Sequence, residues 1–265
     1  MTTQVLDKIK EFECAGEFNR HLSPANWDEA KPVDENFPYI PNRLLKLKYA
    51  LINFFVVKPL RWYQRRIVFK VKIVGRENIK GIKSAIITSN HIAIFDGLAH
   101  SYAFKRHKLK IIGAEFNNKK GWFGESMRAH GLLPLSAKYQ VLKKFSNAVE
   151  HHLLHDSYIL IYPEESLWNM YEKPRPFKNG AFNYAARFFV PVIPVFITFR
   201  SSGKFNKDKT EKKYLTLNIS KAVYPDEKLS VAENMQLLKE DTYNACVKIY
   251  EDIYNKKLTF EKEAF

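Results

Sequence analysis

The sequence predicts an α/β fold with a mostly parallel central sheet flanked by helices, preceded by an N-terminal amphipathic helical hairpin. Three observations carry this prediction. From Phe69 onward, short runs rich in β-branched residues alternate with stretches of helical periodicity, which is typical of a parallel sheet. The 265 residues are enough for one domain with a large core, and 46% hydrophobic content excludes a disordered chain. A basic stretch without acidic residues precedes the alternation.

The chain divides into three segments. Residues 1–41 are rich in turn formers, which predicts an irregular N-terminal adapter segment with one short helix near residues 5–13. Residues 42–68 are expected to form amphipathic membrane-docking helices, and residues 69–265 the α/β domain.

The middle segment belongs to a region between Asn36 and Arg76 that has no Asp or Glu. Its leucines and phenylalanines recur at helical spacing, and Pro59 is expected to break the helix into a hairpin. Basic and aromatic residues along such helices are typical of an interfacial membrane contact. The alternative is a pair of core-packing helices with solvated lysines. The docking candidates are Arg43, Lys46, Lys48, Phe54, Phe55, Arg61, Trp62, Arg65 and Arg66.

The α/β segment contains seven predicted strands, at residues 69–75, 84–90, 109–115, 132–136, 157–163, 190–199 and 213–220. Helices are predicted between most of them and at the end, at residues 97–105, 121–129, 138–155, 180–188 and 231–255. In such folds, ligands collect at the carboxyl ends of the strands.

Composition restricts the class of partner. A net charge of +15 predicts a polyanionic partner, such as nucleic acid, an anionic membrane or an acidic carrier. No nucleic-acid partner is expected, because no module with stacking aromatics between basic residues is present. Cys14 and Cys246 have no partner spacing, which excludes a disulfide framework and favours a reducing compartment. The N-terminus lacks a signal peptide, and no apolar run is long enough to cross a bilayer.

A pair of residues with catalytic chemistry follows the second predicted strand. Asn90 and His91 stand at its end, and Asp96 and Gly97 begin the next helix. On one continuous helix, side chains five residues apart diverge by about 140°, but a strand-to-helix turn lets the carboxylate hold one imidazole nitrogen. The other nitrogen is then free to act as a general base on a hydroxyl or thiol.

The same His-x4-Asp spacing recurs at His151 and Asp156. His151 lies inside a predicted amphipathic helix, on the side away from its apolar residues, so the geometry favours His91. His151, His155 and Asp156 could be read as metal ligands, but His152 stands where a metalloprotease helix has its glutamate. We therefore expect no metal and no cofactor.

Several ordered motifs resemble those of the glycerolipid acyltransferases, of the lysophosphatidic acid acyltransferase type. SNHIAIFDG is similar to the first motif of that family. YPEESLW stands where the family has Phe-Pro-Glu-Gly-x-Arg, and FKNGAFNYAARFFVPVIPVFITF resembles the helix and strand that follow. The resemblance covers about residues 40–225.

The resemblance implies a reaction in phospholipid biosynthesis. His91 would be the general base and Asp96 its orienting carboxylate, with Asn90 and Gly97 supporting the site or its oxyanion. A lysophospholipid hydroxyl, first of all that of 1-acylglycerol 3-phosphate, would attack the thioester of acyl-CoA or acyl carrier protein and give phosphatidic acid. The protein is then expected to act as a peripheral protein on the anionic cytoplasmic face of the cell membrane.

The chain departs from the family pattern where the acceptor phosphate is expected to bind. Glu165 and Leu167 replace the glycine and arginine of the Pro-Glu-Gly-x-Arg motif, and Ala137 replaces a second arginine. Lys138 and Arg175, together with Glu164, are the nearest acceptor-binding candidates. Because lysine binds phosphate only as a point charge, the acceptor could instead be another lysolipid, an aminolipid or a glycolipid. A basic non-enzymatic protein that binds membrane or nucleic acid is the remaining alternative.

Some residues near these motifs have equally plausible structural interpretations. Glu164 could be an ordinary solvated carboxylate at a strand end. Trp168 and Tyr171 either pack the loop or bind the acceptor, and the sequence does not decide between these interpretations.

Overall fold

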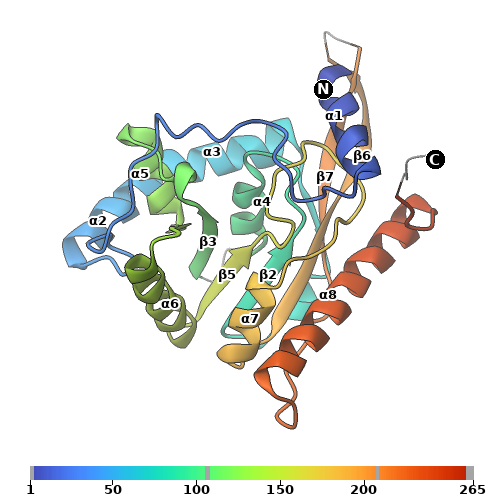
Figure 1. The fold of residues 1–265 in the computed structure, drawn as a ribbon. Coiled ribbons are helices and arrows are strands. Elements are labelled where there is room, and N and C mark those ends of the chain that lie inside the picture. The colour runs from blue at the N-terminus through green and yellow to red at the C-terminus, as the bar shows by residue number, and fades with distance from the viewer. Residues whose placement is uncertain (1–2, 105–107, 207–208, 261–265) are drawn as a thin grey trace.

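The computed structural model describes residues 3–104, 108–206 and 209–260. It confirms the α/β class and all seven predicted strands, which form one sheet in the order β1-β7-β6-β2-β5-β3-β4 (Figure 1). The strands are β1 Lys72–Val74, β2 Ala85–Ser89, β3 Lys108–Ala114, β4 Leu132–Leu135, β5 Ser157–Ile161, β6 Val192–Phe205 and β7 Glu211–Ile219. Neighbouring strands are parallel except for the antiparallel pair β6 and β7.

Helices cover both faces of the sheet. One face packs against α6 Tyr139–Leu154, α7 Gly180–Arg187 and α8 Val231–Tyr254, and the other packs against α4 Asp96–Ala103. Strand β2 contributes Ile86 to the first core and Ile87 to the second, because successive side chains of a strand point to opposite faces. Helix α5 Gly121–His130 contacts β4 at the sheet edge, and short 3₁₀ turns occupy Arg76–Ile79 and Glu115–Asn117. Lys105, the last residue of one predicted helix, lies outside the described residues.

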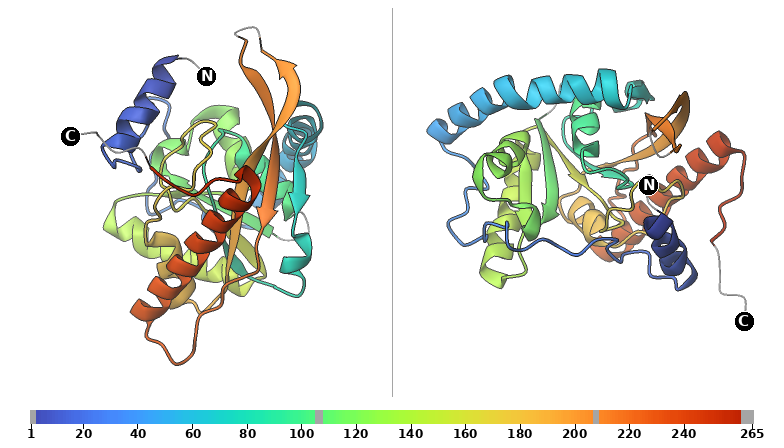
Figure 2. Two further views of the ribbon diagram at one scale, coloured as in Figure 1. Left: turned by 90° about the vertical axis from the view of Figure 1, so that its right-hand side faces the viewer. Right: turned by 90° about the horizontal axis from the view of Figure 1, so that it is seen from above.

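The predicted N-terminal hairpin is wrong, because residues 43–68 form one continuous helical rod. The rod consists of α2 Arg43–Ile52, a π-helical stretch Asn53–Val57, α3 Lys58–Tyr63 and a second π-helical stretch Gln64–Val68. Right-handed helical dihedrals persist at each junction, and the rod runs along one side of the molecule (Figure 2). The wide π turn before Pro59 accommodates the missing backbone N–H, so the proline does not reverse the chain.

The rod exposes a large apolar surface. The exposed fraction is 77% for Leu44, 69% for Phe55 and 59% for Trp62. The other exposed apolar residues of the rod are Leu47, Leu51, Phe54, Leu60, Tyr63, Ile67 and Val68. Among the described residues, no helix combines the length and the apolar character that crossing a bilayer requires.

The described part of the N-terminal segment, residues 3–41, wraps across the loops that follow the strands. Helix α1 Thr3–Cys14 buries Ile9 and Phe12 against Trp168 and Tyr171 in a small separate core. The segment then continues along the molecule to the start of the rod (Figure 2). The N-terminal segment contacts the loop of residues 163–178, which follows β5, and through this loop it is linked to the functional site.

Candidate active site

The site lies at the carboxyl end of β2, the central strand of the sheet. His91 is two residues beyond the strand, and Asp96 is the first residue of α4. The Nδ1 atom of His91 lies 2.8 Å from Oδ2 of Asp96, which is the contact that the sequence predicts. The His91 side chain is 22% exposed and Asp96 only 1%. Within the described chain, the Nε2 atom of His91 has no hydrogen-bonding partner.

The Asp96 carboxylate is ionised and held from several directions. Its Oδ2 atom also accepts hydrogen bonds from the backbone N–H groups of Ile92 at 3.1 Å and Ala93 at 3.4 Å. Burial alone would raise the pKa of Asp96, but His91, His100 and the hydrogen bonds together bring it below its ordinary value. A carboxylate in this state orients an imidazole and stabilises the imidazolium that forms during proton transfer.

Tyr162, the first residue after β5, contacts both His91 and Asp96. Its hydroxyl donates to Oδ1 of Asp96 at 2.6 Å. Its ring stacks on the His91 imidazole, with ring centroids 4.1 Å apart and an interplanar angle of 17°. The pKa of Tyr162 is raised by burial and by the Asp96 charge, so the hydroxyl remains a donor.

Asn90, the first residue after β2, ties the site to the neighbouring strand β6. Its side-chain amide donates to the Ile197 carbonyl at 3.0 Å and its amide oxygen accepts from the Ile197 N–H at 2.8 Å. The nitrogen and the oxygen of the side-chain amide are thus both used to extend the pairing of β2 with β6. Asn90 therefore supports the site and does not contact the oxyanion. Gly97 packs tightly, since a Cβ atom there would lie 3.0 Å from the Ile111 side chain.

The loop between β5 and α7, residues 163–178, holds the backbone around His91. The N–H groups of Trp168 and Met170 donate to the carbonyls of His91 and Ile92 at 3.0 and 2.9 Å. The Glu164 carboxylate accepts a longer, 3.4 Å bond from the His91 N–H. The loop therefore forms a second wall of the site and binds the turn that carries the imidazole through two backbone pairs and the Glu164 carboxylate.

Arg175 and Glu164 are fully committed to each other and to this loop, which corrects their predicted acceptor-binding role. Both side chains are 1% exposed. Arg175 donates to Glu164 through Nε and Nη2, to Ser166 Oγ and O, and to the Phe18 carbonyl. All five N–H donors are used, so this arginine has none free for an acceptor phosphate. The alternative of a solvated Glu164 is also wrong.

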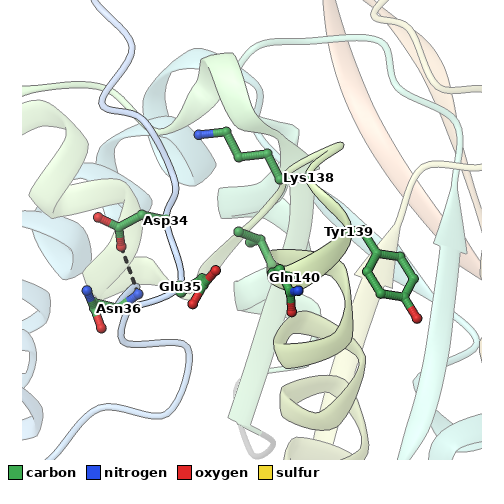
Figure 3. A pocket seen from close by; sticks show the side chains of 7 residues that line it. Asp34, Glu35, Asn36, Lys138, Tyr139 and Gln140 are labelled. Carbon is green, nitrogen blue, oxygen red and sulfur yellow. Dashed lines mark hydrogen bonds between the residues drawn. The ribbon is translucent and has the colours of Figure 1, made fainter.

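Lys138, the third predicted acceptor-binding residue, lies after β4 and not beside His91, so the structure does not bring it to the imidazole. It precedes α6 and lines an open cavity of about 460 Å³ together with Asp34, Glu35, Asn36 and Tyr139 (Figure 3). Strand β4, which leads to Lys138, is three positions from β2 in the sheet order. At about 4.8 Å per strand, β2 and β4 are separated by roughly 14 Å.

Trp168 and Tyr171 pack the loop. Trp168 is completely buried and donates from its indole N–H to the Arg20 carbonyl at 2.9 Å. The Tyr171 hydroxyl donates to Glu13 at 2.7 Å. The structural interpretation of these two aromatics is therefore the correct one.

The docking candidates separate into two groups on the rod. Exposed positions hold Arg43, Lys46, Lys48, Phe54, Phe55, Trp62 and Arg66. Arg61 and Arg65 are half-buried instead, and the Arg65 guanidinium lies 3.6 Å from the ring centroid of Tyr102 in α4. The Arg65 contact attaches the rod to the domain, so the predicted place of Arg65 on an outer docking face is not supported.

Sequence reasoning assigned no role to three contributors to the site. Tyr162 was identifiable in principle, because it ends the strand next to β2 and so shares its edge of the sheet. The backbone carbonyls of Phe18 and Arg20 carry no sequence signal, since any residue supplies a carbonyl. In the described chain, no group of three or more His, Cys, Asp or Glu residues could hold a metal ion.

Comparisons with known proteins bear on the family and on the fold. Residues 70–198 match the model of the Acyltransferase family. A solved structure with a similar fold is the 1-acyl-sn-glycerophosphate (LPA) acyltransferase PlsC from Thermotoga maritima. It is 18% identical, with a TM-score of 0.50 over 82% of this chain and 98% of that chain. A search by sequence among curated proteins found no match. Residues 70–198, which include His91 and Asp96, are therefore similar to the Acyltransferase family.

Proposed function

We propose that the protein transfers a fatty acyl group from an acyl thioester, acyl-CoA or acyl carrier protein, to the free hydroxyl of a lysophospholipid. The observation that carries the proposal is the His91–Asp96 contact at the carboxyl edge of the sheet, with one imidazole nitrogen held and the other free. The first acceptor to test is 1-acylglycerol 3-phosphate, because the similarly folded PlsC is an LPA acyltransferase.

The reaction follows from the roles of the two nitrogens. Nδ1–H of His91 donates to Asp96, so Nε2 is the basic atom and takes the proton of the acceptor hydroxyl. The acceptor oxygen then attacks the thioester carbonyl carbon, and the C–S bond breaks when the tetrahedral intermediate collapses. The imidazolium returns its proton to the departing sulfur, which leaves an ester, a free thiol and neutral His91.

The second part of the proposal is a peripheral place on the anionic cytoplasmic face of the cell membrane. The rod supports it, because exposed Leu44, Phe55 and Trp62 alternate with exposed bases. Helix α3 and the second π stretch contact α4, which begins with Asp96. A membrane-bound rod would therefore keep the site near acceptors that stay in the bilayer.

A different acceptor is the second candidate, and a specific observation favours it. Leu167 and Ala137 stand where the resembled motifs have arginines, and Arg175 has no free donor. Acceptors without a phosphate monoester, such as other lysolipids, aminolipids or glycolipids, need no bidentate arginine. This candidate keeps the same base and the same acyl donor.

One experiment tests the reaction and separates the acceptors. The purified protein is incubated with acyl-CoA or acyl carrier protein and a panel of lysolipids, and mass spectrometry identifies new esters. We expect a diacyl product from the wild type and none from His91→Ala at equal fold stability. Equal activity of the two proteins would remove His91 as the base, and absence of any product from the whole panel would reject the proposed function.

A further inference from the structure

We propose that Tyr162 is a positioning residue of this site. Its hydroxyl holds the Asp96 carboxylate through Oδ1, the oxygen that His91 does not contact. The proposal deepens the proposed function and rests on it, since Tyr162 would act on the same general base. It concerns a residue where the resembled motif has phenylalanine, so the hydroxyl is a feature of this chain.

The fold brings Tyr162 to both partners at once. Strands β2 and β5 are paired in register through Thr88 and Ile161, so Tyr162, the residue after β5, lies beside the turn that carries His91. From there the ring covers one face of the imidazole and the hydroxyl reaches Asp96. A single side chain thereby restricts the imidazole plane and the carboxylate rotation.

The two carboxylate oxygens have unequal support. Oδ2 receives His91 Nδ1 and the N–H groups of Ile92 and Ala93. Among the described residues, Tyr162 is the single hydrogen-bond donor to Oδ1. Since Asp96 is 1% exposed, the loss of this donor would leave a buried anionic oxygen unsatisfied.

The remaining groups that face Asp96 do not replace the hydroxyl. From α4, the His100 ring contacts the Asp96 main-chain carbonyl at 2.8 Å and not the carboxylate, and burial lowers the pKa of His100. From α5, His130 lies beyond Gly97 and contacts Ser101. The base His91, on the turn after β2, is therefore the only group among these whose charge changes during the reaction.

The sign of the expected pH effect follows from this arrangement. The hydroxyl stabilises ionised Asp96 and disperses part of its negative charge. Without it, both Asp96 and the adjacent imidazole hold protons more tightly, so the coupled pair loses its basic form at a higher pH. The acid limb of the kcat/KM profile should then move upward.

Tyr162→Phe tests the hydroxyl alone, because the stacked ring is kept. We expect kcat to fall about 10-fold, the size of one lost hydrogen bond to a charged group, with KM for the lysolipid unchanged. Tyr158→Phe is the matched control: Tyr158 lies in β5, the strand that Tyr162 follows, and its hydroxyl donates to the Ile82 carbonyl at 2.8 Å. That variant should keep the wild-type kcat and pH profile.

Site-specific 3-fluorotyrosine at position 162 gives a second, nearly isosteric variant. Its more acidic hydroxyl is a stronger donor, so the acid limb should move downward, opposite to the shift in Tyr162→Phe. Two shifts of opposite sign cannot arise from a general loss of structure. Wild-type kcat and an unmoved acid limb in both variants would overturn the proposal.

A nitrogen-15 NMR titration of the His91 imidazole separates this inference from the proposed function, since it needs no substrate. If the wild type transfers no acyl group to any acceptor, the proposed function fails, yet the titration still reports on Tyr162. An imidazole that titrates higher in Tyr162→Phe and lower with 3-fluorotyrosine supports the inference. Identical titrations in all three proteins contradict it.

Discussion

Arg175 encloses the carboxylate of Glu164, with its Nε and Nη2 atoms 3.0 and 2.7 Å from the same oxygen. The same carboxylate reaches the backbone of His91, and the same guanidinium reaches the carbonyl of Phe18 in the N-terminal segment. The ion pair thus connects three parts of the chain that are distant in sequence. Arg175 follows the YPEESLW motif and is not part of it, and it holds the loop of residues 163–178 in place.

Arg175→Met is expected to destabilise the protein by about 3–5 kcal/mol, because it leaves Glu164 charged, buried and unpaired. The double variant with Glu164→Gln should cost less than the sum of the two single changes, since no lone charge remains. Chemical denaturation measures these differences, and Arg187→Met, an exposed arginine of α7, is the control. Additive losses would show that the two side chains do not depend on each other.

Glu13→Ala is expected to loosen the loop of residues 163–178 from α1. The buried Glu13 carboxylate pairs with Lys173 and accepts the Tyr171 hydroxyl bond, so its removal leaves both without that partner. Chymotrypsin should then cut faster within this loop, after Trp168 or Tyr171, and acyl transfer should fall. Glu11→Ala changes an exposed carboxylate of the same helix and should leave the cleavage rate unchanged. Equal cleavage of both variants would contradict a holding role for α1.

The sequence predicted the fold better than the site. Strands such as 84–90 and 157–163 were recognisable because β-branched residues and turn formers are local signals. The His91–Asp96 contact was also predictable, since a strand-to-helix turn leaves little freedom over five residues. The rod was mispredicted because a π turn can absorb Pro59, and the partners of Arg175 were not predictable because they are assembled by long-range packing.

Asp96→Asn is expected to lower kcat by about 10²- to 10⁴-fold, because a neutral amide no longer stabilises the imidazolium or selects the productive tautomer. Asp156→Asn is the matched control, since Asp156 has the same spacing from His151. Its backbone has φ of 54°, a conformation that asparagine adopts readily, so the control should fold and react normally. A steady-state assay with one donor compares them, and equal losses in both variants would refute the assignment of His91.

Replacement of Phe54 and Phe55 by serine is expected to weaken binding to vesicles that contain anionic lipid. The two rings are 57% and 69% exposed on the rod, and each buried side chain of this size contributes about 1.5–3 kcal/mol at an interface. Phe189→Ser is the control, because Phe189 is 49% exposed but lies between α7 and β6, at the opposite edge of the sheet from His91. Vesicle co-sedimentation at two salt concentrations measures the loss. Unchanged binding of the double variant would place the membrane contact elsewhere.

Buried histidines give the stability of the fold a predictable dependence on pH. Burial lowers the pKa of His130 from its ordinary 6.5 to about 4, and it lowers the pKa of His100 as well. Between these values the unfolded chain binds protons that the native protein excludes, so the free energy of unfolding falls as the pH drops from about 6.5 towards 4. For His130 the full effect is on the order of 3 kcal/mol. Asp96 acts in a separate pH range, since a carboxylate with a lowered pKa loses its contribution to stability only below about pH 4.

Urea unfolding at pH 4.5 to 7.5 measures this dependence. The slope of the free energy of unfolding against pH should be shallower for His130→Gln than for the wild type, by up to one proton. Parallel slopes would mean that His130 is not buried in its neutral form.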